Sequence, residues 1–305
     1  MNDIKILQPY VSRFESLRVQ LHNEAFRQIG TDIFEQEGVP YTGRSNPDFA
    51  NEMVKKFIKH TRKVRQKKYI VYELACGNGL LALYFLNILQ RDYPKIYRIT
   101  HIYLSDNSEL IIRDIIKSNM YSAHSGHVFI KVADALKLKF NPKPFFVYFV
   151  NLLDSLPCRH IRVENNKAFE IKISTFQKNG SLQEATGLVP IDEIVNIDET
   201  ERNNLKEYLT SLPQNKTYVF NYSFASGNLI RRILKNLAKN GLFMISDFGI
   251  GTTQNKNFAL WSEYGKTIFF SVDFDYIKYM ANISGARFRV TNNHPQDPQD
   301  IWLER

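Results

Sequence analysis

The segment from Tyr69 to Leu86 limits the possible folds more than any other part of this sequence. It has the pattern of a buried apolar strand, a turn that contains Gly77 and Gly79, and an apolar helix start. Because glycine lacks a Cβ, the backbone of such a turn can pass close to a bound molecule. Ligands of α/β proteins bind at the carboxyl ends of parallel strands. We therefore expect an α/β domain with a nucleotide-like cofactor beside this turn.

Acidic side chains accompany the first three strands that we predict for this domain. Glu73 lies in the first apolar run, Asp106 ends a strand at residues 101–106, and Asp134 follows a strand near residues 127–132. A carboxylate at a strand end can hydrogen-bond the hydroxyls of a ribose, and a later one could accept from an adenine amino group. Each acid also has a structural alternative, as an ion-pair partner, a helix cap or a loop residue. The three together favour a nucleoside cofactor.

The spacing E-x-x-x-G-x-G, from Glu73 to Gly79, resembles motif I of class I S-adenosyl-L-methionine (SAM) methyltransferases. The same turn satisfies the looser dinucleotide pattern G-x-G-x-x-A, which leaves an NAD-linked oxidoreductase as an alternative. Both cofactors would use Asp106. The strand before a dinucleotide turn has no counterpart of Glu73, however, and the dinucleotide fingerprint makes no demand on Asp134. The sequence therefore favours SAM.

Strand and helix patterns alternate from residue 69 onward, which predicts a parallel sheet covered on both faces. The first 68 residues are expected to be helical around a loop. The expected strands lie at residues 69–75, 101–106, 127–132, 145–151 and 242–247. Helices are expected up to residue 91 and at residues 108–119 and 226–240. The chain is expected to end with a strand, a helix and a strand at residues 267–273, 274–284 and 286–291.

An insertion interrupts this alternation at about residues 153–225. Its segments 159–164 and 167–175 flank Asn165-Asn166 and predict a β-hairpin. A helix near residues 199–212 and an extended segment at 217–222 follow. Because connections at the carboxyl edge of a sheet often carry function, we expect this insertion to form a cap over the substrate.

Two further motifs resemble one family of methyltransferases. Asp154-Ser-Leu-Pro157, followed by a basic segment, is similar to the Asp-Ala-Leu-Pro-Val signature of the MidA-like methyltransferases, which include the mitochondrial complex I assembly methyltransferase. Ser246-Asp247-Phe248-Gly249 is similar to the Ile-Asp-Tyr-Gly motif of that family. The similarity extends over about residues 69–285.

The resemblance implies a Rossmann-like class I methyltransferase fold. Such a fold has a mostly parallel seven-stranded sheet with an antiparallel final strand, here with an N-terminal helical region (1–68) before the SAM-binding domain (69–305). It implies an enzyme that transfers a methyl group from SAM to a protein side chain, with arginine as one possibility, or to a small molecule. The cofactor-binding residues it indicates are Glu73, Ala75, Gly77, Gly79, Asp106, Asn107, Asp134 and Ala135. The catalytic residues it indicates are Asn151, Asp154 and Asp247.

One departure from the family pattern affects the acceptor. The family has Asn-Glu after the fourth strand, whereas this chain has Val150-Asn151. A guanidinium stays charged at neutral pH, and its methylation needs acids that orient it and take a proton. Asn151 removes one such acid, although its side-chain carbonyl could still align a nitrogen or oxygen nucleophile. A non-catalytic assembly or scaffolding protein with the same fold is therefore the main alternative.

Composition restricts the partners and the location. The net charge is +9, and the region from Lys55 to Lys68 contains eight basic residues and no acid. We expect a solvated helix face there and no nucleic-acid partner, because no aromatic side chains alternate with the basic ones. No segment predicts a membrane span or a signal peptide. Cys76 and Cys158 are expected to be buried free thiols in a cytoplasmic protein, and no His or Cys spacing predicts a metal site.

Overall fold

The computed structural model describes residues 5–21, 24, 44–253, 259–264, 267–291 and 298–305. The chain forms two compact units, and each combines segments that are distant in the sequence. The first contains Met1–Phe26, Leu153–Asn228 and Phe248–Met280. The second contains Arg27–Leu152, Leu229–Asp247 and Ala281–Arg305.

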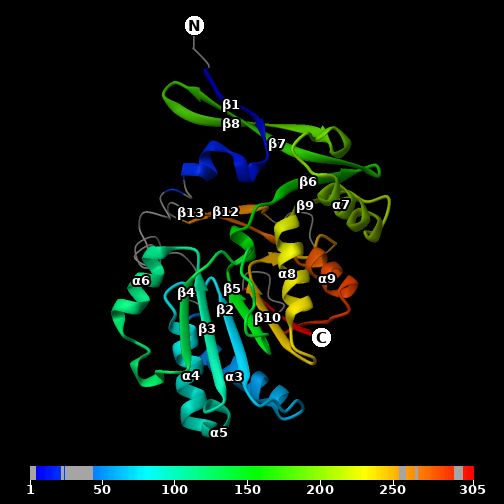
Figure 1. The fold of residues 1–305 in the computed structure, drawn as a ribbon. Coiled ribbons are helices and arrows are strands. Elements are labelled where there is room, and N and C mark those ends of the chain that lie inside the picture. Colours follow the sequence, from blue (N-terminus) through cyan, green and yellow to red (C-terminus); the bar gives the residue numbers. More distant parts are fainter. Residues whose placement is uncertain (1–4, 22–23, 25–43, 254–258, 265–266, 292–297) are drawn as a thin grey trace. The chain divides into compact units, whose positions relative to one another are not determined.

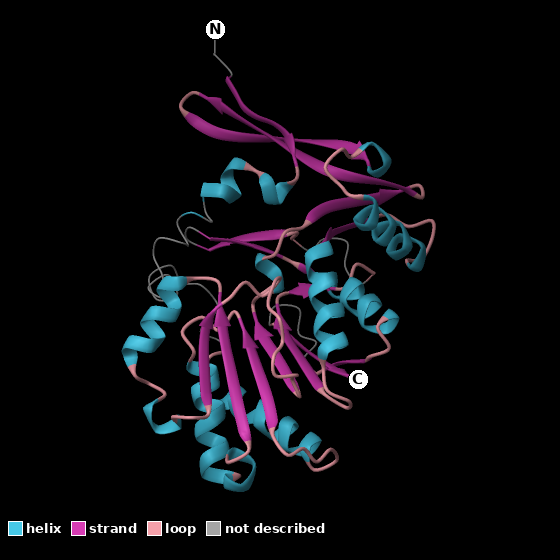
Figure 2. Cartoon of the chain, in the orientation of Figure 1, coloured by secondary structure: helices cyan, strands magenta, loops and turns pink. Residues whose placement is uncertain are grey.

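A seven-stranded sheet forms the centre of the second unit (Figures 1 and 2). Its strand order is β15-β16-β10-β5-β2-β3-β4. The strands are β2 (Tyr69–Leu74), β3 (Thr100–Asp106), β4 (Val128–Val132), β5 (Phe146–Val150), β10 (Leu242–Asp247), β15 (Arg287–Val290) and β16 (Gln299–Glu304). β16 runs in the direction opposite to the other six strands of this sheet. It pairs antiparallel with β10 on one side and with β15 on the other. The prediction of a mostly parallel seven-stranded sheet is confirmed, and the antiparallel strand is β16 rather than the strand expected at residues 286–291.

Helices connect these strands. Those of the second unit are α3 (Pro47–Thr61), α4 (Leu80–Asp92), α5 (Pro94–Tyr97), α6 (Glu109–Ser118) and most of α8 (Phe224–Asn236), whereas α9 (Phe274–Ile283) lies mostly in the first unit. Asn46 caps α3 by accepting from the Phe49 N–H at 2.9 Å, and Pro47 occupies its first turn. Phe57 of α3 packs against Phe85 of α4 and Phe146 of β5, with ring centroids 5.4 and 5.7 Å apart. All three rings are fully buried, as is every residue of β5, so this aromatic cluster lies in the core between the helices and the sheet.

The first unit is built around a five-stranded antiparallel sheet with the order β1-β7-β6-β9, in which β8 pairs with β7. Its elements are β1 (Lys5–Val11), β6 (Arg159–Glu164), β7 (Lys167–Lys178), β8 (Ser181–Pro190), α7 (Glu199–Ser211) and β9 (Tyr218–Tyr222). Two small sheets pair β11 (Gly249–Ile250) with β14 (Val272–Asp273), and β12 (Trp261–Tyr264) with β13 (Thr267–Phe270). The predicted hairpin is confirmed as β6 and β7, with Asn165 and Asn166 both at positive φ, as a tight hairpin turn requires.

Three secondary-structure predictions were wrong or incomplete. Residues 5–11 form a strand where a helix was expected, and Pro9 lies where the register of β1 shifts against β7, a position that suits proline in an edge strand. Residues 267–273 form β13 and β14 outside the main sheet, because their partners are β12 and β11. Neither β8 nor β16 was predicted. In the rest of the N-terminal region, residues 22–23 and 25–43 lie outside the described residues, and α3 confirms the helix expected near residues 47–61.

Candidate cofactor and acceptor site

The turn between β2 and α4 has a backbone conformation that glycine favours. Ala75, Gly77 and Gly79 have φ values of 51°, 52° and 75°. The Tyr121 hydroxyl donates to the Gly79 carbonyl at 2.5 Å, and a Cβ on Gly79 would lie 3.0 Å from that hydroxyl oxygen. The Tyr121 hydroxyl therefore occupies the space beside Gly79 and fixes the backbone of the turn at the carboxyl end of β2.

Asp106 joins this turn to the end of β3. Its side chain is buried, and its two oxygens accept from the Gly77 N–H at 3.2 Å and the Ser108 N–H at 3.0 Å. Burial raises the pKa of the Asp106 carboxyl, while backbone N–H groups of Ser108, Gly77 and Asn107 favour the ionised form. Ser108, and not Asp106, is the N-cap of α6, because its hydroxyl accepts from the Ile111 N–H. The helix-cap alternative for Asp106 is therefore excluded.

Glu73 lies beneath the turn with only 3% of its surface exposed. The Tyr148 hydroxyl donates to Glu73 Oε2 at 3.0 Å, and the Ala82 N–H also bonds this carboxyl. Burial raises the pKa of Glu73 to about 8. The partner that a buried carboxyl needs is therefore a tyrosine of β5, and the group is mostly protonated at neutral pH. Its contact with a cofactor stays a prediction.

We expect the Glu73→Gln variant to be more stable than the wild type at pH 8 and similarly stable near pH 4. The folded-state pKa of Glu73, about 8, exceeds the ordinary value of 4.5. The unfolded chain therefore loses its proton first as the pH rises, and wild-type stability falls between about pH 4.5 and pH 8. A glutamine cannot ionise and escapes this loss, which amounts to as much as about 4 kcal/mol. Denaturant titrations across this pH range measure the difference.

The matched control for this prediction is Glu52→Gln on α3, whose side chain is 62% exposed. It should leave the pH profile of stability unchanged. If Glu73→Gln and the wild type lose stability in parallel between pH 4.5 and pH 8, Glu73 is already ionised in the folded protein and the assignment is wrong.

Asp134 and Ala135 lie in the loop after β4. Asp134 Oδ1 accepts from the Leu136 N–H at 2.8 Å, and Lys137 Nζ lies 3.7 Å from Asp134 Oδ2. Arg232 of α8 donates to the carbonyl oxygens of Ala135 and Leu136. The Asp134 side chain remains 41% exposed. The loop is thus fixed in place, and its contact with an adenine stays a prediction.

Asn151 and Asp247 come together at the ends of the neighbouring strands β5 and β10. The Asn151 N–H donates to the Ser246 carbonyl at 2.9 Å, and the Leu152 N–H donates to Asp247 Oδ2 at 3.1 Å. Asn151 has φ of 49°, a conformation that asparagine tolerates better than most residues. Its Oδ1 is buried and accepts no hydrogen bond from the described part of the chain. A buried acceptor oxygen at the end of β5 is therefore left for another donor, and the carboxylate of Asp247 at the end of β10 is also buried.

Asp154 belongs to the first unit, in a short 3-10 helix at Leu153–Ser155. Its side chain is 1% exposed. Its predicted role beside Asn151 and Asp247 stays a prediction.

Sequence reasoning missed two tyrosines that support the site. Tyr148 bonds Glu73, and Tyr121 bonds the Gly79 carbonyl. Tyr148 could have been found, because a tyrosine in a fully buried strand needs a partner for its hydroxyl. No local pattern marks Tyr121, whose contact depends on the fold.

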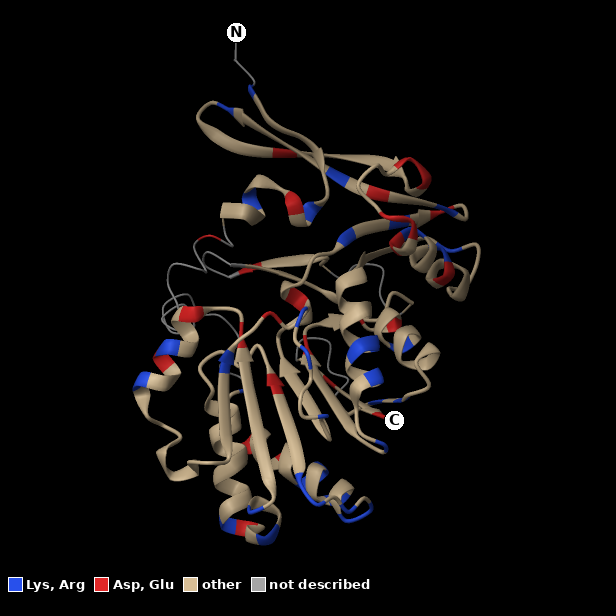
Figure 3. Cartoon of the chain, viewed as in Figure 1, with Lys and Arg blue, Asp and Glu red and all other residues tan. Residues whose placement is uncertain are grey.

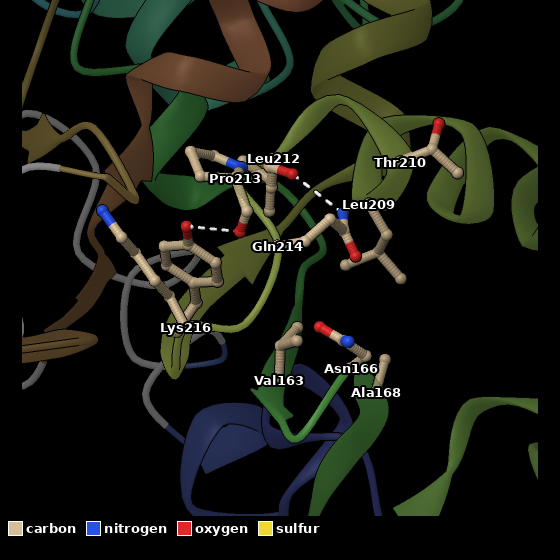
Figure 4. A pocket seen from close by; sticks show the side chains of 10 residues that line it. Val163, Asn166, Ala168, Leu209, Thr210, Leu212, Pro213, Gln214 and Lys216 are labelled. Atoms are coloured by element: carbon tan, nitrogen blue, oxygen red, sulfur yellow. Dashed lines mark hydrogen bonds between the residues drawn. The ribbon is translucent and has the colours of Figure 1, made fainter.

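A separate pocket of about 160 Å³ lies in the first unit (Figure 4). Apolar side chains of Val163, Leu209 and Leu212 line it together with Asn166 and Lys216. Its volume is below that of typical small-molecule sites, and its lining contains no carboxylate. We assign it no part in the site described above.

Among the described residues no cluster of His, Cys, Asp or Glu side chains could hold a metal ion. The helices in the described part of the chain all lack the length and apolar character needed to cross a membrane.

Two solved structures share this fold. A protein from Burkholderia thailandensis described as a "likely methyl transferase", bound to S-adenosyl-homocysteine, has a TM-score of 0.61 and 15% identity, and the match covers 85% of this chain and 77% of that one. A native structure of an uncharacterised protein of the same superfamily, also from Burkholderia thailandensis, has a TM-score of 0.61 and 15% identity over 95% and 90% of the two chains. No curated protein matches the sequence.

The sequence itself matches one family over most of its length. Residues 50–291 match the family described as "Putative S-adenosyl-L-methionine-dependent methyltransferase". The cofactor of this family is SAM, which agrees with the prediction from the glycine turn. The chain belongs to this family of SAM-dependent methyltransferases.

Proposed function

We propose that this protein is a class I, MidA-like methyltransferase that acts on a nucleophile bearing an N–H or O–H group. The observation that carries the proposal is the hydrogen bond from the Gly77 N–H to the Asp106 carboxylate, which joins the glycine turn to the end of β3 at the carboxyl end of the parallel sheet. Acidic residues lie at this end of otherwise uncharged central strands (Figure 3).

The residues around this hydrogen bond have the chemical groups that SAM binding needs. An ionised carboxylate offers about four lone-pair positions, so Asp106 can accept hydroxyl donors in addition to its backbone N–H groups. In the turn next to Asp106, Gly77 and Gly79 have no side chains. Ala75, Gly77 and Gly79 all have positive φ. Asn107, Asp134 and Ala135 follow the ends of β3 and β4, where they could border the base.

Asn151 and Asp247 would position the methyl acceptor. Bound SAM supplies a methyl group on a sulfonium, which is a good leaving group. Asn151 Oδ1 would accept a hydrogen bond from the nucleophile and so hold its lone pair in a fixed direction. Asp247 would stabilise positive charge on the acceptor and could take its proton. Protein side chains, including arginine, and small molecules both satisfy this requirement.

Calorimetry and methyl transfer test the proposal together. SAM should bind the purified chain, and tritium from methyl-labelled SAM should appear in an acceptor fraction of a cell extract only when the chain is present. Failure to bind SAM at millimolar concentration would refute the proposal.

The replacement of the family Asn-Glu by Val150-Asn151 favours a second candidate, a non-catalytic assembly protein with this fold. This candidate predicts SAM binding without turnover, or no binding, together with a stable partner in pull-down experiments. Methyl transfer that is lost in an Asp106 variant would exclude it. For either candidate we propose a cytoplasmic location, which the two buried free cysteines support.

A further inference from the structure

Strand β4 forms an apolar edge of the seven-stranded sheet. It lies at the end of the strand order and pairs with β3 alone among the described strands (Figure 1). Its sequence is Val-Phe-Ile-Lys-Val, and Phe129 and Val132 are 43% and 46% exposed. Most proteins shorten, bulge or charge such edges, because a regular apolar edge pairs readily with another strand.

The same edge ends a row of stacked rings on one face of the sheet. Tyr72, Tyr103 and Phe129 occupy opposing positions on β2, β3 and β4, with centroid separations of 4.9 and 4.8 Å. Residues 133–145, which connect β4 to β5, contain no helix. Phe129 therefore ends the row with its outer side open.

The backbone of β4 has a defined set of groups that point away from the sheet. The Ile102 N–H donates to the His127 carbonyl, and the Ala133 N–H donates to the Asp106 carbonyl. In a parallel ladder this alternation directs the N–H and C=O groups of Phe129 and Lys131 toward β3. Those of residues 128, 130 and 132 point outward.

We infer that β4 is the interface of a symmetric homodimer, in which two copies pair antiparallel about a two-fold axis at Ile130. Ile130 is the centre of the five-residue strand, so this register uses its whole length. Val128 pairs with the partner's Val132, and Ile130 pairs with the partner's Ile130. In each of these pairs the outward N–H and C=O groups of one residue form hydrogen bonds with those of the other. The sheets of the two copies then become one continuous sheet.

The charge on β4 favours this register and this partner. Lys131 is the one charged residue of the strand and lies on the same face as Phe129. In the proposed pairing it lies directly opposite the partner's Phe129, where an ammonium group and a ring attract each other. A register centred one residue later would place Lys131 against the partner's Lys131, which is repulsive. A second copy of the chain thus satisfies both the backbone and the side chains of the edge.

Charge-swap variants test the inference in the full chain. Sedimentation equilibrium should give a concentration-dependent mass approaching twice 35.6 kDa for the wild type. Phe129→Lys places Lys against Lys131 of the other copy and should weaken dimerisation at least about tenfold, because the symmetric interface contains this pair twice. The double variant Phe129→Lys/Lys131→Glu restores opposite charges and should recover the dimer. Ile283→Lys changes another exposed apolar residue, 52% exposed, and should have no effect.

Hydrogen exchange provides a measurement that needs no variant. The Ile130 amide should exchange slowly at high protein concentration and rapidly on dilution, because in a monomer it faces solvent at the sheet edge. A wild-type chain that remains monomeric at every soluble concentration would overturn the inference. So would a dimer whose mass and Ile130 exchange do not respond to Phe129→Lys or to dilution. SAM binding by each variant is measured separately, so failure of the dimer and failure of the proposed function are distinguishable.

Discussion

Replacement of Asp106 by alanine is expected to weaken SAM binding by about 100-fold or more. Hydrogen bonds to a charged group contribute about 1.5–3 kcal/mol each, and a ribose offers two hydroxyl donors. Every 1.4 kcal/mol corresponds to about a tenfold change in affinity. Isothermal titration calorimetry of the wild type and the variant with SAM measures the loss.

This experiment requires two controls, because Asp106 also accepts the Gly77 and Ser108 N–H groups. Asp106→Asn keeps one acceptor oxygen and should retain more of the fold, with an intermediate affinity. Asp92→Ala removes an acid with a 39% exposed side chain at the end of α4 and should bind SAM normally. Circular dichroism and thermal unfolding identify any variant that is not folded. A folded Asp106→Ala variant with unchanged affinity for SAM would show that the cofactor does not bind at the end of β3.

The Asn151→Gly variant is expected to bind SAM within about twofold of the wild type and to transfer methyl groups about 100-fold more slowly. Glycine adopts the φ of 49° at this position without strain, so the substitution removes chiefly the side chain. Loss of a preorganised hydrogen-bonding group at a reacting centre costs about 10²–10³ in kcat. Tritium transfer from labelled SAM to the acceptor fraction measures the rate, and calorimetry measures the affinity.

Asn151→Asp is the matched control, because it keeps an acceptor oxygen at the same position and tolerates the same backbone. It should retain more activity than Asn151→Gly. It should also favour a cationic acceptor over a neutral one, because it places an acid where the MidA-like pattern that the sequence resembles has glutamate. Equal rates for all three proteins would show that Asn151 does not contact the acceptor. Loss of SAM affinity in Asn151→Gly would assign the residue to the cofactor instead.

The glycine turn and its acid could be predicted because the information is local. Residues 69–86 contain the strand, the turn and the helix start in one continuous segment, and the structure has them as β2, the turn and α4. The position of Asp106 followed from the same reasoning, because parallel strands end at a common edge. Its side chain accepts a hydrogen bond from the Gly77 N–H, so the end of β3 and the glycine turn do meet, and its contact with a cofactor stays a prediction.

The errors concern pairing between distant segments. Residues 5–11 were expected to be helical, and nothing near them in the sequence indicates β7 as their strand partner. The pattern of residues 267–273 predicts extended structure, yet the choice between the main sheet and a hairpin with β12 depends on packing elsewhere. The last strand, β16, was missed although it completes the main sheet between β10 and β15.

The sequence by itself determined the α/β class and the residues of the glycine turn, because both depend on short spacings along the chain. It indicated SAM through the resemblance of that turn to motif I of class I methyltransferases. Only the tertiary structure decided that Glu73 is buried against Tyr148 and that Asn151 Oδ1 has no hydrogen-bond donor among the described residues. It also decided that β4 is the last strand of the seven-stranded sheet in the part of the chain that the structure describes. Burial, pKa and hydrogen-bond satisfaction depend on residues that are remote in the chain, so no local pattern contains them.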